Sequence, residues 1–165
     1  MFKTLRRWGL IGALIILIGI QAIPYGRNHT NPPTRVEPAW DSPETRELAV
    51  RACFDCHSNE TDWPWYSYIA PFSWLVQGDV DDGRKKLNFS EWNRPQEHAG
   101  QAAKMVREGT MPLWRYGVFH PRANLSSSEM QALIRGLVAT IGEEKGDDRQ
   151  DREDREHNEK PHKHN

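Results

Sequence analysis

The residues best suited to chemistry are two cysteines and a histidine within the segment Cys53–Phe54–Asp55–Cys56–His57. Two thiols separated by two residues, with histidine directly after them, form the pattern of covalent c-type haem attachment. This spacing lets both thiols add to the two vinyl groups of one porphyrin. His57 then follows closely enough to bind the iron as the proximal ligand. The chain contains 2 cysteines, so the motif uses both of them.

Two other kinds of site use a similar pattern. A thioredoxin-type redox motif follows a strand in a βαβ setting, which is not indicated here. A structural zinc site needs four ligands, usually with a second closely spaced pair of Cys or His, and no such pair follows. We therefore predict one covalent haem c, tethered by Cys53 and Cys56 and ligated by His57.

A second loop predicts the sixth ligand of the iron. Met111 stands in the segment Gly109–Thr110–Met111–Pro112, and its thioether is a soft ligand suited to haem iron. Pro112 disfavours helical backbone at Met111, which helps the side chain to reach inward from a loop. Packing in the core is the alternative role for this methionine. Three other residues remain open as the sixth ligand: Met105, His98 and His120.

The N-terminus joins a basic start to a long apolar run. Lys3, Arg6 and Arg7 precede a stretch from Trp8 to Ile23 that carries no charge. Counted from Leu5, this run makes about 28 Å of helix, enough to span a bilayer core of ~30 Å. A cleaved secretory signal shares the pattern, but no small-x-small cleavage site stands out. We predict an uncleaved anchor over residues 1–24.

The basic residues indicate the orientation of this anchor. Lysine and arginine beside a membrane helix stay on the cytoplasmic side, which sends the rest of the chain outward. We therefore predict a single-pass protein of the cell inner membrane, with its haem domain on the periplasmic side. Export agrees with the motif, because covalent c-type haem is generally assembled on the outer face of bacterial membranes.

Helix signals predict an all-α domain over residues 42–142. Ser42–Pro43–Glu44 is typical of a helix start, and the predicted helix runs into Cys53. Pro71 is expected to open a helix that ends near Gly83, and Asn93–Arg94–Pro95 another that ends at Gly109. Ser126 and Glu129 predict a capping box on the last helix. In that helix Gly136 would let another helix cross closely, and Gly142 would end it.

The segments before and after this domain differ from it in composition. Residues 25–41 contain three prolines and predict an extended spacer with little to bury. Residues 143–165 are almost purely polar and predict a disordered charged tail. The run Arg84–Lys85–Lys86 is interpreted as a solvated face, with docking of a partner or of a haem propionate as the alternative. A formal net charge of -1 gives no indication of a nucleic-acid partner.

Taken with these motifs, the chain resembles the bacterial haem-binding-domain family of cytochrome-c-like proteins. The resemblance covers roughly residues 40–140. It rests on the following stretches: Ala52 to Asn59, Trp63–Pro64–Trp65–Tyr66–Ser67, Ala70–Pro71 with Ser73–Trp74–Leu75, Leu87–Asn88–Phe89–Ser90–Glu91–Trp92, and Met111–Pro112–Leu113–Trp114 with His120–Pro121. It implies an exported, often membrane-anchored c-type haem protein with a cytochrome-c-like helical fold.

These observations favour a membrane-anchored monohaem cytochrome that carries single electrons, with His57 and Met111 as axial ligands. A redox partner protein in or at the membrane is expected, and no enzymatic activity. Two alternatives stay open. A haem enzyme or gas sensor would need an open sixth site with a distal histidine or arginine. An accessory subunit of a membrane oxidoreductase would use its haem as an electron relay or as a structural core.

Overall fold

The computed structural model describes residues 2–144 as an all-α protein, which confirms the predicted fold class. The predicted tail from residue 145 onward lies outside the described residues. Within them no strand forms, and a single isolated bridge joins Val36 to Glu91. The helices are α1 (Phe2–Ile20), α2 (Pro43–Ala52), α3 (Phe54–His57), η1 (Trp65–Tyr68), α4 (Phe72–Lys86), η2 (Ala99–Gln101), α5 (Ala102–Arg107), α6 (Trp114–Phe119), η3 (Pro121–Ala123) and α7 (Ser127–Ile141).

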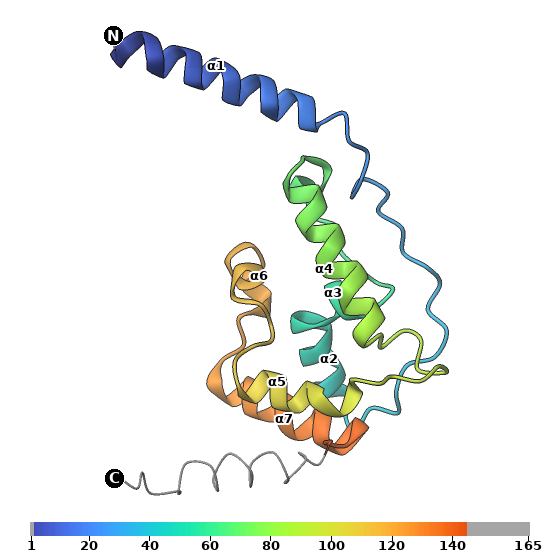
Figure 1. Cartoon of the computed structure of the whole chain (residues 1–165). Helices are drawn as coiled ribbons and strands as arrows, with labels where there is room; N and C mark the ends of the chain where they lie inside the picture. Colours follow the sequence, from blue (N-terminus) through green and yellow to red (C-terminus); the bar gives the residue numbers. More distant parts are fainter. Residues whose placement is uncertain (1, 145–165) are drawn as a thin grey trace, which may run out of the picture.

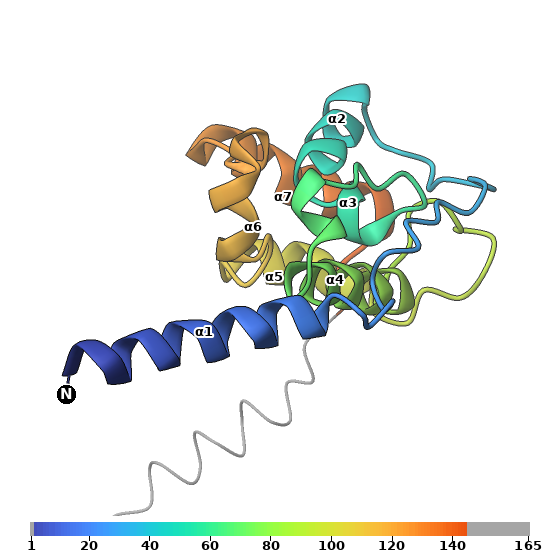
Figure 2. The same ribbon diagram turned by 90° about the horizontal axis from the view of Figure 1, so that it is seen from above.

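Helix α1 projects from the rest of the molecule (Figures 1 and 2). The span Lys3–Ala22 is long and apolar enough to cross a membrane, and none of it is buried. A signal sequence would satisfy the same test, so length and composition alone fit both roles. The end of α1 is tied to the helical domain, because the Gln21 side chain donates to the Ala70 carbonyl at 2.9 Å and accepts from the Ala70 amide at 3.1 Å.

Helices α2 and α7 cross at close range, as the glycine on α7 predicts. A Cβ on Gly136 would overlap the side chain of Thr45 on α2, so only glycine permits this approach. Both helix starts also follow the sequence. The Ser42 hydroxyl accepts from the Thr45 amide at 3.1 Å, and Ser126 with Glu129 forms the full capping box.

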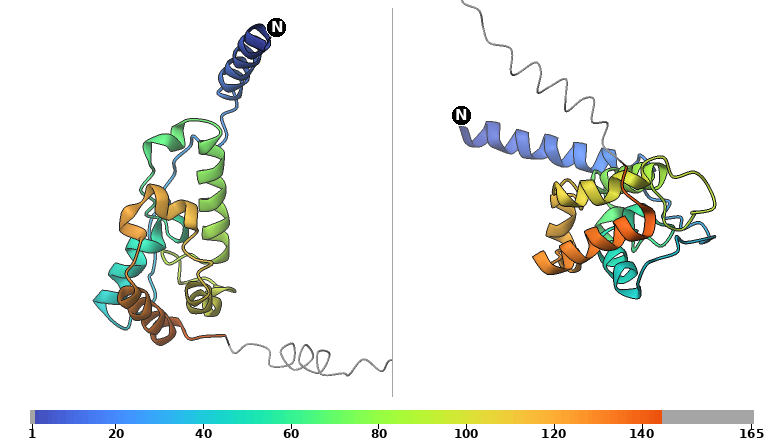
Figure 3. Two further views of the ribbon diagram at one scale, coloured as in Figure 1. Left: turned by 90° about the vertical axis from the view of Figure 1, so that its left-hand side faces the viewer. Right: turned by 90° about the horizontal axis from the view of Figure 1, so that it is seen from below.

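The core lies where α2, α3, α5 and α7 meet the segment after α4. Helix α5 packs along α7, and the views from the side and from below show the pair together (Figure 3). The aromatic part of the core stacks the Phe54 and Phe89 rings at 5.6 Å between centroids, with Trp40 and Trp92 beside them. Its fully buried aliphatic members include Leu133 and Leu137 of α7.

The proline-rich spacer contacts the domain more than its composition predicts. Pro38 is buried, and Trp40 packs against the core. Gly26 has a φ of +76° and lies so close to the Ser73 carbonyl that a side chain would overlap it. The expectation of little burial is therefore wrong for these residues, because an extended chain can still bury single side chains against a neighbouring surface.

Two helix boundaries also differ from the expectation. The helix predicted to open at Pro95 begins only at η2 and α5, and α4 continues three residues beyond Gly83, to Lys86. The delay after Pro95 has a tertiary cause. The Gln96 side chain accepts from the Asn88 amide at 2.9 Å and donates to the Glu91 carbonyl at 2.9 Å, which holds this segment as a turn. Helix α6 was not predicted from the sequence.

Candidate haem site

The geometry of the motif starts with the imidazole of His57. Its Nδ1 lies 3.0 Å from the Gly83 carbonyl oxygen and 3.1 Å from that of Leu87. A carbonyl only accepts, so Nδ1 carries the proton, and Nε2 keeps a free lone pair for a metal. Burial lowers the pKa of His57, which also favours the neutral, ligating form.

The two cysteines stand where α2 ends and α3 begins. Cys53 caps α2, donating its backbone N–H to the Ala49 carbonyl, and Cys56 lies one turn further along on α3. Neither forms a disulfide. Burial raises the pKa of both thiols to about 12, so they stay protonated near neutral pH. Cys53, Cys56 and His57 all line the cavity that extends toward α4 and α6.

Close packing of α4 against α3 fixes this turn. A Cβ on Gly83 would overlap the backbone carbonyl of Cys56, so α4 reaches the motif only because a glycine stands there. The top view shows α3 lying between α2 and α4 (Figure 2). Gly83 thus has two roles in the site. Its lack of a side chain lets α4 approach Cys56, and its carbonyl accepts from Nδ1 of His57.

Two adjoining cavities meet at the motif. One, of about 260 Å³, extends toward α5 and α7, and the other, of about 200 Å³, extends toward α4 and α6. Both are lined by six of the same residues: Ala52, Cys53, His57, Lys86, Met111 and Pro112. The predicted proximal and sixth-ligand positions therefore lie where the two cavities adjoin, together with the thiol of Cys53. The other walls of the cavity toward α5 and α7 include Leu87, Phe89, Val106 and Leu137, which suit a flat apolar macrocycle.

The loop that carries Met111 is held by α5. The Thr110 and Met111 amides both donate to the Met105 carbonyl, at 3.0 and 3.2 Å. Gly109 ends the helix with a φ of +69°, the left-handed backbone that favours glycine. Met111 is half-buried, and it alone among the four ligand candidates lines both cavities.

The three alternative ligands are placed less favourably. The Met105 sulfur lies 3.1 Å from the Thr110 hydroxyl, which donates to it. His98 is exposed, and like Met105 it lines only the cavity toward α5. His120 lines neither of the two cavities that contain His57. This geometry favours Met111, which remains a prediction.

Sequence reasoning missed the residues that hold the motif from outside. The Arg84 guanidinium donates to the Ser58 carbonyl at 2.8 Å and to the Thr61 hydroxyl at 2.9 Å. It also reaches Thr30 and Asn31 in the spacer. The expectation of a solvated basic face is therefore wrong for Arg84, although Lys85 is exposed. Nothing in the local pattern distinguishes these two cations, because their difference arises from tertiary contacts.

Within residues 2–144, a metal-ion site made of His, Cys, Asp and Glu side chains has less support than a haem site. No group of three or more His, Cys, Asp or Glu residues is placed to hold a metal ion in this part of the chain. The donor set that does converge is two thiols, one imidazole and one thioether around an apolar space. These residues fit a haem attached through both cysteines.

Comparison with known proteins agrees with this donor set. A family model described as "Haem-binding domain" matches residues 15–139, which confirms the resemblance found in the sequence. No curated protein and no solved structure matches the chain.

Proposed function

We propose, on the premise that the chain belongs to the haem-binding domain family, that it carries single electrons as a membrane-anchored monohaem c-type cytochrome. The observation that carries the proposal is the shared lining of the two cavities. Cys53, His57 and Met111 all line both of them. This set supplies a tether and two axial donors of different chemistry.

Each residue has one task in this proposal. Cys53 and Cys56 would tether the haem by thioether bonds, and Nε2 of His57 and the sulfur of Met111 would bind its iron. When bound, haem supplies a one-electron iron couple whose potential is higher with a histidine–methionine pair than with two strong nitrogen donors. The backbone carbonyls of Gly83 and Leu87 hold the His57 ring in its ligating tautomer.

The walls of the cavities favour electron carriage over catalysis. Four of the wall residues are buried: Leu87, Phe89, Val106 and Leu137. Such walls exclude water and hold the ligands in place, so little rearrangement accompanies a change of charge. A methionine in the sixth position would also exclude substrates from the iron.

One observation supports the sensor or enzyme alternative. His98 lines the cavity toward α5, where it would face a small molecule if Met111 did not bind the iron. The accessory-subunit alternative shares all the haem contacts proposed above and differs only in its partner. A redox partner protein in or at the membrane, and a haem domain on the outer face of the inner membrane, complete the proposal.

The experiment that tests this function uses the full chain, expressed with c-type haem maturation. We expect one haem per chain, haem stain retained on a denaturing gel, and a reversible one-electron titration. Replacing both cysteines (Cys53→Ala with Cys56→Ala) should abolish the stain. Haem that extracts into acidified organic solvent, or a chain that cannot be reversibly oxidised and reduced, would contradict the proposal.

A further inference from the structure

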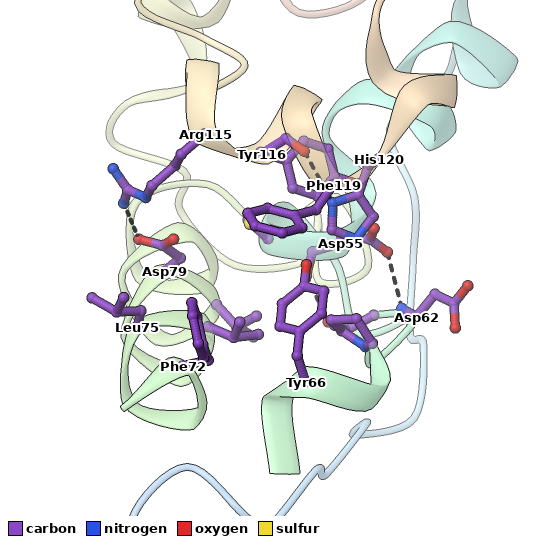
Figure 4. Close-up of a pocket in the computed structure, with 15 residues that line it drawn as sticks. Asp55, Asp62, Tyr66, Phe72, Leu75, Asp79, Arg115, Tyr116, Phe119 and His120 are labelled. Carbon is purple, nitrogen blue, oxygen red and sulfur yellow. Dashed lines mark hydrogen bonds and ion pairs between the residues drawn. The ribbon is translucent and has the colours of Figure 1, made fainter. Parts of the chain in front are cut away.

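A third cavity, of about 260 Å³, lies beside the haem site between α4, η1 and α6. Neither His57 nor Met111 lines it, but Asp79 and Tyr116 line both this cavity and the haem cavity toward α4 and α6, so the two adjoin. Cys56 does line it, which places the cavity directly next to one predicted haem tether. Figure 4 shows its side chains converging from the three helical segments and from Asp55 and Asp62.

The walls are largely apolar and aromatic, and Tyr66 and His120 bring polar groups toward one another. Tyr66 contacts the Phe119 ring at 5.1 Å between centroids, and its hydroxyl makes no hydrogen bond to any residue from 2 to 144. Burial raises the pKa of Tyr66, so the hydroxyl keeps its proton. In the same view Tyr66 rises from η1 toward Phe119 and His120 (Figure 4).

His120 offers the second polar group. Its Nδ1 lies 3.1 Å from the Tyr116 carbonyl oxygen, so Nδ1 donates, and in the neutral ring Nε2 is an acceptor. The ring is held in place by stacking on the Tyr116 ring at 4.1 Å between centroids. Two neighbouring polar side chains are already paired: the Tyr116 hydroxyl donates to Asp55, and Arg115 pairs with Asp79. The carboxylate of Asp62 points away from the other labelled side chains (Figure 4).

The mouth of the cavity is lined by apolar side chains that are open to the surroundings. Phe72, Leu75 and Phe119 line the cavity and are 46%, 55% and 57% exposed. Tyr68, Ile69 and Val118, which are near these residues in the chain, are exposed as well. Exposed aromatic side chains of this kind are typical of surfaces that meet a membrane or an apolar ligand.

The mouth also lies next to the end of α1. Gln21 at that end is hydrogen-bonded to Ala70, two residues before Phe72. Figure 1 shows the start of α4 and the whole of α6 in the half of the domain nearest to α1, away from α5 and α7. A ligand dissolved in the bilayer around α1 would therefore meet this mouth first.

We propose that this cavity binds the ring of a lipid-soluble quinol whose apolar tail leaves between Phe72, Leu75 and Phe119. One ring hydroxyl donates to Nε2 of His120, and the other bonds to the Tyr66 hydroxyl. A plain acyl chain would cover both polar groups without giving either a partner, and a polar group that a ligand buries unpaired is costly. The inference rests on the proposed function, and it specifies a membrane-soluble molecule as a partner of the haem domain.

The test is calorimetric titration of the full-length haem protein in lipid nanodiscs with a short-tailed ubiquinol. The haem is kept reduced, so binding is measured without oxidation of the ligand. We expect saturable binding, and about tenfold weaker binding for Tyr66→Phe and for His120→Phe, because each loses one hydrogen bond. Tyr68→Phe is the matched control on the same short helix, outside the cavity, and should bind like the wild type.

Two further arms identify the ligand chemistry and the location. The same ring with both hydroxyls methylated should bind at least tenfold more weakly, and Leu75→Trp, which fills the exposed mouth, should abolish binding while the haem spectrum is kept. No saturable binding, equal affinity for the methylated ring, or equal losses in Tyr66→Phe and Tyr68→Phe would overturn the inference. Met111→Ala changes the iron site alone, so its quinol affinity should be unchanged even if the carrier proposal fails.

Discussion

Nδ1 of His57 lies 3.0 Å from the carbonyl oxygen of Gly83, and the absent side chain of this same glycine is what brings α4 against Cys56. The orientation of the proximal imidazole and the packing of the attachment motif therefore depend on one backbone position. A residue without a side chain gives no chemical signal in the sequence, yet it holds two of the site's key groups.

Substitution of this glycine should impair the haem site specifically. Gly83→Ala places a methyl group against the Cys56 carbonyl, and we expect a loss of stability of ~1–3 kcal/mol with reduced haem attachment. Gly78→Ala is the control in the same helix, since a Cβ there meets nothing within 4 Å. It should leave the haem content unchanged and stabilise the helix by ~0.5–1 kcal/mol. Denaturant unfolding and haem-to-protein ratios check both; equal behaviour of the two variants would contradict this account.

How far the sequence predicts this site depends on the kind of interaction. Cys53, Cys56 and His57 are candidates because their chemistry and spacing are local, and Met111 is a candidate through its own Gly–Thr–Met–Pro loop. The starts of α2 and α7 are also predicted, since Ser42 and Ser126 bond within a few residues. The Gly83 and Leu87 carbonyls could not be predicted, because any residue supplies a carbonyl and only the fold decides which one His57 meets.

The same reasoning explains the missed contacts of Arg84. Arg84→Met should destabilise the domain by ~1–3 kcal/mol, because the carbonyl of buried Ser58 loses its donor. Lys85→Met, at the next position, is exposed and should change stability by less than ~0.5 kcal/mol. Thermal unfolding of the two variants measures the difference. A loss at Lys85 as large as that at Arg84 would show that the basic run acts through its charge and not through these bonds.

Acid should weaken the contact between α2 and α7. Arg51 lies 2.5 Å from Glu129 and lowers the pKa of that carboxyl to about 2, helped by the Ser126 amide. A carboxyl with a depressed folded-state pKa contributes stability above its ordinary pKa of 4.5 and loses it as the pH falls toward 2. We therefore expect Glu129→Gln to unfold at lower denaturant than wild type at pH 7, and at the same denaturant concentration near pH 2. A difference that persists unchanged in acid would rule out this pairing as its cause.

The close crossing of α2 and α7 should tolerate no added bulk. Gly136→Ala would drive a methyl group into the Thr45 side chain, and we expect it to cost ~1–3 kcal/mol. The double variant Gly136→Ala with Thr45→Ala removes both the hydroxyl and the methyl group that a Cβ at position 136 would meet, and should recover part of this loss. Chemical unfolding of the wild type, the two single variants and the double variant gives the coupling. Additive effects would show that the two positions do not meet.

Binding of carbon monoxide to the ferrous protein tests the central claim most directly, because it reports whether Met111 occupies the sixth position of the iron. Wild type should bind carbon monoxide poorly, since the gas must first displace the thioether. Met111→Ala should bind it readily and should lose the weak far-red band of the ferric spectrum, whereas Met105→Ala should behave like wild type. Rapid binding by the wild type, at the rate of Met111→Ala, would contradict the carrier proposal and favour the sensor or enzyme alternative.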